Sequence, residues 1–335
     1  MNALLTVEDL SIGFRSEGKV VTVVRGVNFT LEAGKTLALV GESGSGKSVT
    51  SLGIMGLLPP PPQSVTGGRI ILHGKGDADL LTLPESRMRR VRGDRIAMIF
   101  QEPLTSLNPV HTVGAQIVEA IRSHRRMTRK AARARAVELI EQVGIPDAAA
   151  RLGTYPHELS GGMRQRIMIA IALALEPDIL IADEPTTALD VTVQAQIIDL
   201  LRRLQADTGM AMLFITHDFG VVADVADRTI VMYAGEMVEE GETDTVLGRP
   251  LMPYTSGLMS AVPKLQTAGL KQGELQTIDG FVPDPANLPV GCSFHPRCRH
   301  VREGLCDVPP VPLEDAGRGH MVRCKRWQEL SEANG

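Results

Sequence analysis

Residues 41–48 read Gly-Glu-Ser-Gly-Ser-Gly-Lys-Ser and directly follow the apolar run 36–40. This spacing of glycine, lysine and serine requires a strand that leads through a tight loop into a helix. The glycines let consecutive backbone N–H groups converge on phosphate oxygens, while Lys47 supplies a cation and Ser48 a hydroxyl for Mg²⁺. The segment therefore predicts an α/β fold that binds a nucleoside triphosphate. The candidate nucleotide contacts are Gly41, Ser43, Gly44, Ser45, Gly46, Lys47, Ser48 and Val49.

Two adjacent carboxylates end a second apolar run, residues 179–182. The run is typical of a buried parallel strand, and open α/β sheets bind ligands at the carboxyl ends of such strands. We expect Asp183 to hold Mg²⁺ and Glu184 to polarise the attacking water. The alternative is that the two acids only cap the turn before Pro185.

Two more apolar runs are followed by polar side chains that could take part in the same hydrolysis reaction. Residues 96–100 lead to Gln101, and residues 212–216 lead to His217. A glutamine in this place can reach Mg²⁺ or the attacking water, and His217 can touch the γ-phosphate. Without the other motifs, Gln101 is better interpreted as an ordinary polar residue at a strand end, and a single histidine at a strand end is often structural.

A second glycine-rich segment, residues 159–162, reads Leu-Ser-Gly-Gly and precedes a stretch rich in Ile, Ala and Leu. Ser160 is a favourable N-cap, which predicts a helix from Met163 to Leu175. The paired glycines leave the amides at the helix start bare, and such a start binds anions. In a helix that is merely capped and buried, these glycines would lower helix stability for no return.

Residues 1 to about 260 resemble the ATPase subunit of ATP-binding cassette transporters, because six motifs occur in the family's order. They are the Walker A loop at 41–48, the Q-loop glutamine Gln101, the LSGG signature at 159–162, the Walker B strand ending in Asp183-Glu184, the D-loop at 188–190 and the switch histidine His217. The family usually has glutamine directly after LSGG, where this chain has Met163. The resemblance implies a P-loop nucleoside triphosphatase of the α/β class. It further implies an antiparallel β subdomain and a helical subdomain at about 102–176.

The resemblance also implies how the nucleotide is used. In this family, the signature of one subunit closes on the ATP held by the P-loop of another, so we expect a head-to-tail dimer with two ATP molecules. Ser160, Gly161 and Gly162 would then contact the partner's nucleotide. Phe14 occupies the place of an aromatic side chain that stacks on adenine, although a phenylalanine in an amphipathic strand also suits a core.

The implied roles divide the site residues between hydrolysis and metal binding. The catalytic residues are Glu184, His217 and Gln101, and the Mg²⁺ ligands are Ser48, Gln101 and Asp183.

Two stretches, 102–109 and 183–196, resemble the oligopeptide and dipeptide importer branch of the family. This implies that ATP hydrolysis powers peptide import, together with a second, related ATPase subunit, two transmembrane permease subunits and an extracytoplasmic solute-binding protein. The alternative is a soluble cassette ATPase that acts on nucleic acid or ribosomes. Such proteins usually join two cassettes or insert a long coiled coil, whereas this chain has one P-loop, one signature and no long heptad run.

Charge and hydropathy limit where the chain works. A formal net charge of -4 argues against nucleic acid as a partner. The longest apolar run, residues 167–175, is about half the length needed to span a bilayer. The first ten residues lack the basic region and cleavage site of an export signal. We therefore expect a peripheral protein on the cytoplasmic face of the cell (inner) membrane, held there by its permease.

The chain changes character after about residue 260, and we expect a separate C-terminal extension at 261–335. This extension is rich in Pro and Gly and contains all four cysteines: Cys292, Cys298, Cys306 and Cys324. Disulfides are disfavoured under reducing conditions, whereas zinc, with or without His295, His300 or His320, and an iron–sulfur cluster are both chemically reasonable. The tail resembles the extension of peptide-importer ATPases, some of which carry a [4Fe-4S] cluster, and this implies a [4Fe-4S] cluster on the four cysteines.

Overall fold

A computed structural model describes residues 3–16, 18–74, 76–102, 106–261 and 278–333. It divides into two compact units, and we describe each by itself. The first comprises Met1–Thr6, Thr30–Thr36 and Ile71–Ile215, and the second comprises Val7–Phe29, Leu37–Ile70 and Thr216–Gly335. The importer-like stretch 102–109 includes residues that the structure does not describe. The predicted domain boundary at 260/261 lies next to such residues and stays a prediction.

Three apolar runs in the first unit form parallel strands. They are β6 (Ile96–Ile99), β7 (Ile179–Asp183) and β8 (Ala211–Thr216), with Ile99 opposite Ala182 and Asp183 opposite Ile215. Every residue of β7 and β8 is buried, as expected for parallel strands covered on both faces. Asp183 is thereby placed at the carboxyl end of a central strand. β6 ends at Ile99, one residue before the predicted end.

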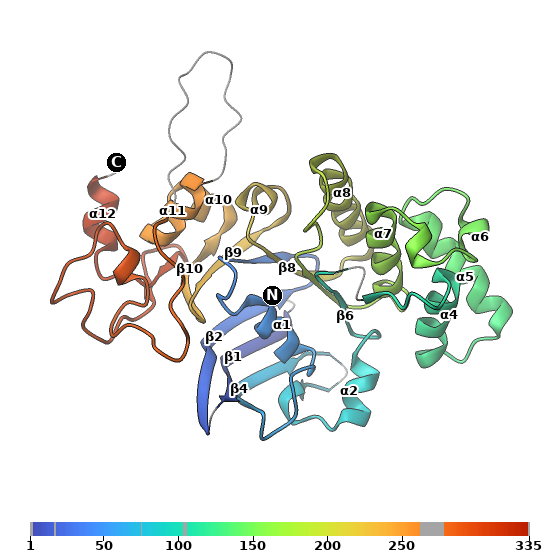
Figure 1. Cartoon of the computed structure of the whole chain (residues 1–335), viewed down its shortest axis with the longest axis horizontal. Coiled ribbons are helices and arrows are strands. Elements are labelled where there is room, and N and C mark those ends of the chain that lie inside the picture. Colours follow the sequence, from blue (N-terminus) through green and yellow to red (C-terminus); the bar gives the residue numbers. More distant parts are fainter. Residues whose placement is uncertain (1–2, 17, 75, 103–105, 262–277, 334–335) are drawn as a thin grey trace, which may run out of the picture. The chain divides into compact units, whose positions relative to one another are not determined.

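The first unit also contains helices. They are α2 (Glu85–Val91), α4 (Val113–His124), α5 (Arg129–Gln142), α6 (Ala148–Arg151), α7 (Gly161–Ala172) and α8 (Val191–Thr208). Of these, α4 to α8 follow β6 or β7 along the chain. α4 packs on α5 and α7, and α7 packs on β6 and α8 (Figure 1). Hydroxyl caps start three of them, because the side chains of Thr112, Thr128 and Ser160 each accept a hydrogen bond from the N–H three residues on. Helices α4 to α7 all fall within the range predicted as helical, 102–176.

The second unit is built on β3 (Thr36–Val40), which pairs in parallel with β9 (Arg228–Tyr233). β10 (Glu236–Glu242) runs antiparallel to β9, and the short strands β12 (Met321–Val322) and β11 (Glu314–Asp315) extend the same sheet. The helices of this unit are α1 (Lys47–Ile54), α9 (Phe219–Val225), α10 (Thr243–Gly248), α11 (Pro253–Ala261) and α12 (Trp327–Ala333). The C-terminal tail is therefore part of this sheet, through β12.

A separate antiparallel sheet has the strand order β2-β1-β4-β5. Its strands are β1 (Ala3–Ser16), β2 (Lys19–Glu32), β4 (Ser64–Leu72) and β5 (Ala78–Asp79). The sequence predicts antiparallel strands in residues 4–40 with a turn near Gly18, and β1 and β2 agree with this. It predicts a loop at 59–68 and a strand from Arg69, whereas β4 begins at Ser64 and contains Gly67 and Gly68.

A buried acid joins β10 to the tail. Glu239 has no exposed surface and accepts hydrogen bonds from the N–H groups of Leu251 (2.6 Å) and Met252 (3.2 Å) and from the ring of His320, at 2.8 Å. The tail also contributes Phe294 and Val322 to the hydrophobic core of this unit. The sequence predicts that the tail is too poor in apolar residues to fold alone, and the structure shows which groups attach it.

Glu239→Ala is expected to lower the free energy of unfolding by about 3–5 kcal/mol, because it leaves buried N–H groups and His320 without their acceptor. Urea unfolding followed by the fluorescence of Trp327, the single tryptophan of the chain, measures this change at the tail itself. Glu242→Ala, at the exposed end of the same strand, is the control and should shift the free energy by no more than about 0.5 kcal/mol. Equal midpoints for the two variants would refute the role given to Glu239.

No helix within the described residues is both long and apolar enough to cross a membrane.

Candidate functional site

The P-loop joins β3 to α1 through backbone that only glycine adopts easily. Gly41, Gly44 and Gly46 have φ of 156°, 81° and 99°. A Cβ on Gly41 would lie 2.3 Å from the carbonyl oxygen of Met232, so any residue other than glycine would clash with the backbone there. Helix α1 begins at Lys47, as predicted, so its N-terminus faces the end of the loop. The loop thus has the backbone needed to bind phosphate.

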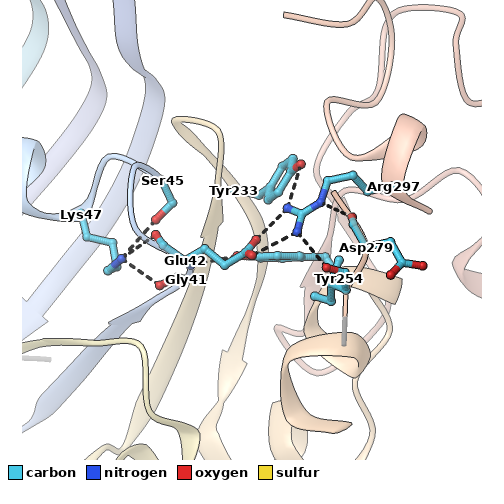
Figure 2. A network of polar contacts seen from close by, with 9 residues as sticks. Gly41, Glu42, Ser45, Lys47, Tyr233, Tyr254, Asp279 and Arg297 are labelled. Atoms are coloured by element: carbon cyan, nitrogen blue, oxygen red, sulfur yellow. Dashed lines mark hydrogen bonds and ion pairs between the residues drawn. The ribbon is translucent and has the colours of Figure 1, made fainter. Parts of the chain in front are cut away.

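Lys47 folds back across this loop. Its Nζ donates to the carbonyl oxygens of Gly41 (2.8 Å) and Glu42 (2.9 Å) and to Oγ of Ser45 (3.3 Å), as Figure 2 shows. Lys47 and Ser45 are buried. Ser43 and Gly44 are exposed, while Ser48 and Val49 are half-buried. A cation is therefore fixed beside a loop whose outer part is open to a ligand.

The carboxylates of the first unit lie where β7 ends. Asp183 is buried, and the next residue, Glu184, has a left-handed backbone with φ of 45°. The N–H of Glu184 donates to the carbonyl oxygen of Ile215 at 2.9 Å. A glutamate rarely adopts this conformation, and such strain concentrates at functional sites.

Two neighbours orient the carboxylate of Glu184. Nε2 of Gln101 donates to its Oε2 at 3.1 Å, and Oγ1 of Thr187 donates to the same oxygen at 2.8 Å. The structure thus brings Gln101 and Glu184 together, although 83 positions separate them. Thr187 is a contact that sequence reasoning missed, even though it lies in the stretch compared with the importer branch. A carboxylate held by two donors is positioned to accept a proton from water.

The signature segment starts α7 as expected. Oγ of Ser160 accepts from the N–H of Met163 at 3.3 Å, which is the predicted N-cap. The helix begins at Gly161 and ends at Ala172, so it is shifted two to three residues toward the N-terminus relative to the prediction. A Cβ on Gly162 would lie 2.7 Å from Cγ1 of Val193 in α8. The sequence argument that these glycines give a packed helix no return is therefore wrong for Gly162, because close packing on α8 needs it.

The predicted nucleotide residues fall in both units. Gln101, Asp183, Glu184 and the signature residues belong to the first unit, and Phe14, the P-loop and His217 belong to the second. Phe14 is half-buried in β1, and His217 is exposed just after β8. Their roles in nucleotide binding stay predictions.

The four cysteines of the tail surround one cavity. Cys292, Cys298, Cys306 and Cys324 are free thiols, and all of them line it together with His295 and His300. The cavity volume is about 20 Å³, which is room for one water molecule. Among the described residues, no three histidine, cysteine or acidic side chains lie close enough together to bind a single metal ion. His320, considered as a ligand from the sequence, instead bonds to Glu239.

Burial keeps three of these four thiols neutral. Burial raises the pKa of Cys292 to about 11 and that of Cys324 to about 12, and burial also raises the pKa of Cys298. Burial lowers the pKa of His300, as do Arg299 and Arg326. At neutral pH the side chains of Cys292, Cys298 and Cys324 are therefore thiols.

An ion pair that could not be predicted from the sequence joins the tail to the P-loop. Arg297, next to Cys298, forms a two-pronged ion pair with Glu42 of the P-loop (Figure 2). The two residues are 255 positions apart. No local pattern in the sequence signals such a pair.

Comparison with known proteins agrees with the resemblance to ATP-binding cassette ATPases. The pattern of the ABC transporter family matches residues 24–187, and that of the oligopeptide/dipeptide transporter C-terminal region matches residues 238–306. The dipeptide transport ATP-binding protein DppD of Bacillus subtilis is 52% identical over 332 residues, which cover 99% of this chain and 97% of DppD. A "putative peptide import ATP-binding protein" of Brucella abortus is 52% identical over 98% of both chains.

Solved structures show the same cassette. The ATP-binding cassette MJ0796, a dimer in a post-hydrolysis state with ADP and Pi, matches with a TM-score of 0.63 and 27% identity over 71% of this chain and 98% of its own. CbiO1 of Clostridium perfringens, part of the ABC transporter complex cbiONQ, matches with a TM-score of 0.62 and 25% identity over 74% of this chain and 92% of its own. These likenesses confirm the predicted P-loop fold. The chain therefore belongs to the ABC transporter family, as an ATPase that uses ATP with Mg²⁺ and carries the oligopeptide/dipeptide transporter C-terminal region.

Proposed function

We propose that this protein hydrolyses ATP to power the import of di- and oligopeptides through a membrane transporter. The observation that carries the proposal is the 52% identity to a dipeptide transport ATP-binding protein along almost the whole of both chains. The match to the oligopeptide/dipeptide transporter C-terminal region supports the same substrate class. The transport direction and the peptide substrate come from these relatives.

Within this proposal, the motif residues divide the tasks of nucleotide binding and hydrolysis, with Gln101 serving both Mg²⁺ and the catalytic carboxylate. The P-loop amides and Lys47 bind the phosphates, while Ser48 and Asp183 bind Mg²⁺. Glu184 accepts the proton of the attacking water, and Gln101 positions the Glu184 carboxylate through its 3.1 Å hydrogen bond. Phe14 stacks on adenine, and His217 contacts the γ-phosphate. The Mg²⁺ ion neutralises charge on the phosphates.

The functional form is a head-to-tail dimer of ATPase subunits. Ser160, Gly161 and Gly162 at the start of α7 contact the nucleotide bound by the partner, where the helix N-terminus offers N–H groups to the γ-phosphate. The dimer of MJ0796 with ADP and Pi supports this arrangement. ATP favours the closed dimer only while its γ-phosphate bridges the interface, so hydrolysis opens it.

The partners follow from peptide import. The second ATPase is a related chain, and the pair docks on two transmembrane permease subunits at the cytoplasmic face of the cell (inner) membrane. An extracytoplasmic solute-binding protein delivers the peptide. The names of the relatives, which are ATP-binding proteins of peptide transport, support a multi-subunit transporter of this kind.

Glu184→Gln is expected to reduce the ATP hydrolysis rate by about 10²-fold or more while ATP still binds, because the amide cannot accept the proton. Steady-state phosphate release gives the rate, and size-exclusion chromatography with ATP detects a trapped dimer. Glu141→Gln, on the exposed surface of α5, is the matched control and should hydrolyse ATP at the parent rate. Turnover by Glu184→Gln at the parent rate would rule out Glu184 as the base.

We further propose that the four cysteines of the tail bind a [4Fe-4S] cluster. Four thiols around one cavity are a suitable donor set, and each iron of a cluster takes one of them. No three His, Cys or acidic side chains among the described residues are arranged to hold a metal ion, so the proposal depends on the four cysteines lining one cavity and on the resemblance of the tail to that of peptide-importer ATPases. Because the cavity holds only about one water molecule, the segments that carry the cysteines would have to move apart for a cluster to bind. ATP hydrolysis needs no electrons, so the cluster is structural or regulatory.

Protein purified without oxygen should contain about four irons and four sulfides per chain and absorb broadly near 400 nm. Cys324→Ser should lose most of the iron, whereas His300→Ala, at the same cavity, should keep it if only the cysteines are ligands. Stoichiometric zinc, or no metal at all, would reject the cluster.

A further inference from the structure

We propose that Arg297 of the C-terminal tail is a positioning residue for the P-loop and acts through Glu42. The inference concerns the ATP site of this chain and does not depend on whether the cysteines bind a cluster. It assigns to the tail a direct effect on nucleotide affinity.

The ion pair between the two residues is bidentate and largely buried. Nη1 of Arg297 donates to Oε2 of Glu42 at 2.8 Å, and Nη2 donates to Oε1 at 3.1 Å. The side chain of Arg297 is 6% exposed, and that of Glu42 is 29% exposed. Two parallel hydrogen bonds fix the direction of a carboxylate as well as its distance, so Arg297 determines where the Glu42 side chain lies.

The guanidinium of Arg297 is itself held on its other sides. Nε donates to the carbonyl oxygen of Asp279 at 2.9 Å, and Nη2 also donates to that of Ile278 at 3.4 Å. The guanidinium carbon lies 5.8 Å from the centre of the Tyr233 ring, and Nη1 contacts the Tyr233 hydroxyl at 3.4 Å. Figure 2 shows Arg297 between these groups and Glu42. The arginine is thus a rigid support.

Glu42 connects Arg297 to the rest of the P-loop through hydrogen bonds of its backbone. Its N–H donates to the hydroxyl of Tyr254 at 2.9 Å, and its carbonyl oxygen accepts from Nζ of Lys47 at 2.9 Å and from the N–H of Ser45 at 3.2 Å. The side chain, the N–H and the carbonyl oxygen of Glu42 therefore each form hydrogen bonds. A displaced Glu42 carboxylate would shift a carbonyl that holds the lysine of the motif.

Aromatic packing connects the support to the cysteine-lined cavity. The rings of Tyr233, Tyr254 and Phe294 pack with centroids 4.6 to 5.3 Å apart. Phe294 also lines the cavity, and Arg297 is followed directly by Cys298. The same few residues of the tail therefore carry both the cysteines and the contact with the P-loop.

Charge gives the pair a second effect on nucleotide binding. A carboxylate in the second position of the P-loop repels a triphosphate, and Arg297 neutralises it. An arginine guanidinium keeps its positive charge in proteins, so this neutralisation does not depend on pH in the range where the enzyme works.

The test is a rescue experiment on the full-length chain. Arg297→Gln should weaken binding of the non-hydrolysable analogue AMP-PNP with Mg²⁺ by about tenfold in calorimetric titration, because the loop is misplaced and the Glu42 charge is released. Steady-state hydrolysis should show a KM raised by a similar factor and a kcat close to that of the parent. Adding Glu42→Gln should bring the affinity of the double variant to within about twofold of that of Glu42→Gln alone, because the repelling charge is gone.

Arg302→Gln is the matched control. Arg302 pairs with Glu329 through two hydrogen bonds in the same tail, but both side chains are about half exposed and neither contacts the P-loop in the described residues. Its AMP-PNP affinity should equal that of the parent. If Arg297→Gln does not fold, Arg297→Lys provides the same measurement, because lysine keeps the charge without the bidentate geometry and should weaken binding to a smaller extent.

Three results would overturn the proposal. The first is an affinity of the Arg297 variant equal to that of the parent. The second is an equal loss in Arg302→Gln, which would indicate a general effect of the tail. The third is a loss that Glu42→Gln does not rescue, which would mean that Arg297 supports the fold and does not act through Glu42.

Discussion

The close approach of the P-loop to β9 constrains the arrangement of strands and helices in the second unit. Gly41 passes the carbonyl of Met232 at a distance that leaves no room for a side chain. β3 and β9 must therefore be adjacent and in register, as their pairing from Leu37 to Val40 shows. The loop can then turn through Gly44 and Gly46 into α1, and Lys47 can reach back to the Gly41 carbonyl. A single steric requirement thus links the sheet, the loop and the cation.

Much of this could be predicted from the sequence, because the signals are local. The P-loop motif specifies its own turn, Ser160 specifies the start of α7, and the apolar runs that end at Asp183 and Thr216 specify buried parallel strands. Each of these depends on backbone propensity, capping or hydrophobicity within a few residues. The order of the motifs along the chain then indicates the family.

The remaining features depend on contacts between distant segments. The pairing of Arg297 with Glu42 and that of His320 with Glu239 follow only when the tail adds β12 to the sheet. The boundaries of β4 could not be read from composition either, because Gly68 suggests a loop. In the structure a Cβ on Gly68 would lie 2.4 Å from the backbone of β1, so this glycine permits close pairing of two strands.

The tail is an integral part of the second unit, which contains the P-loop. It is attached by strand pairing at β12, by the buried Glu239 and by Arg297, and these three attachments differ in kind. Strand pairing and the buried acid hold the tail on β10, far along the chain from the P-loop. Of these three attachments, Arg297 is the one that contacts the P-loop. A change in the tail that preserves the first two attachments can therefore displace the P-loop through Arg297 without unfolding the unit.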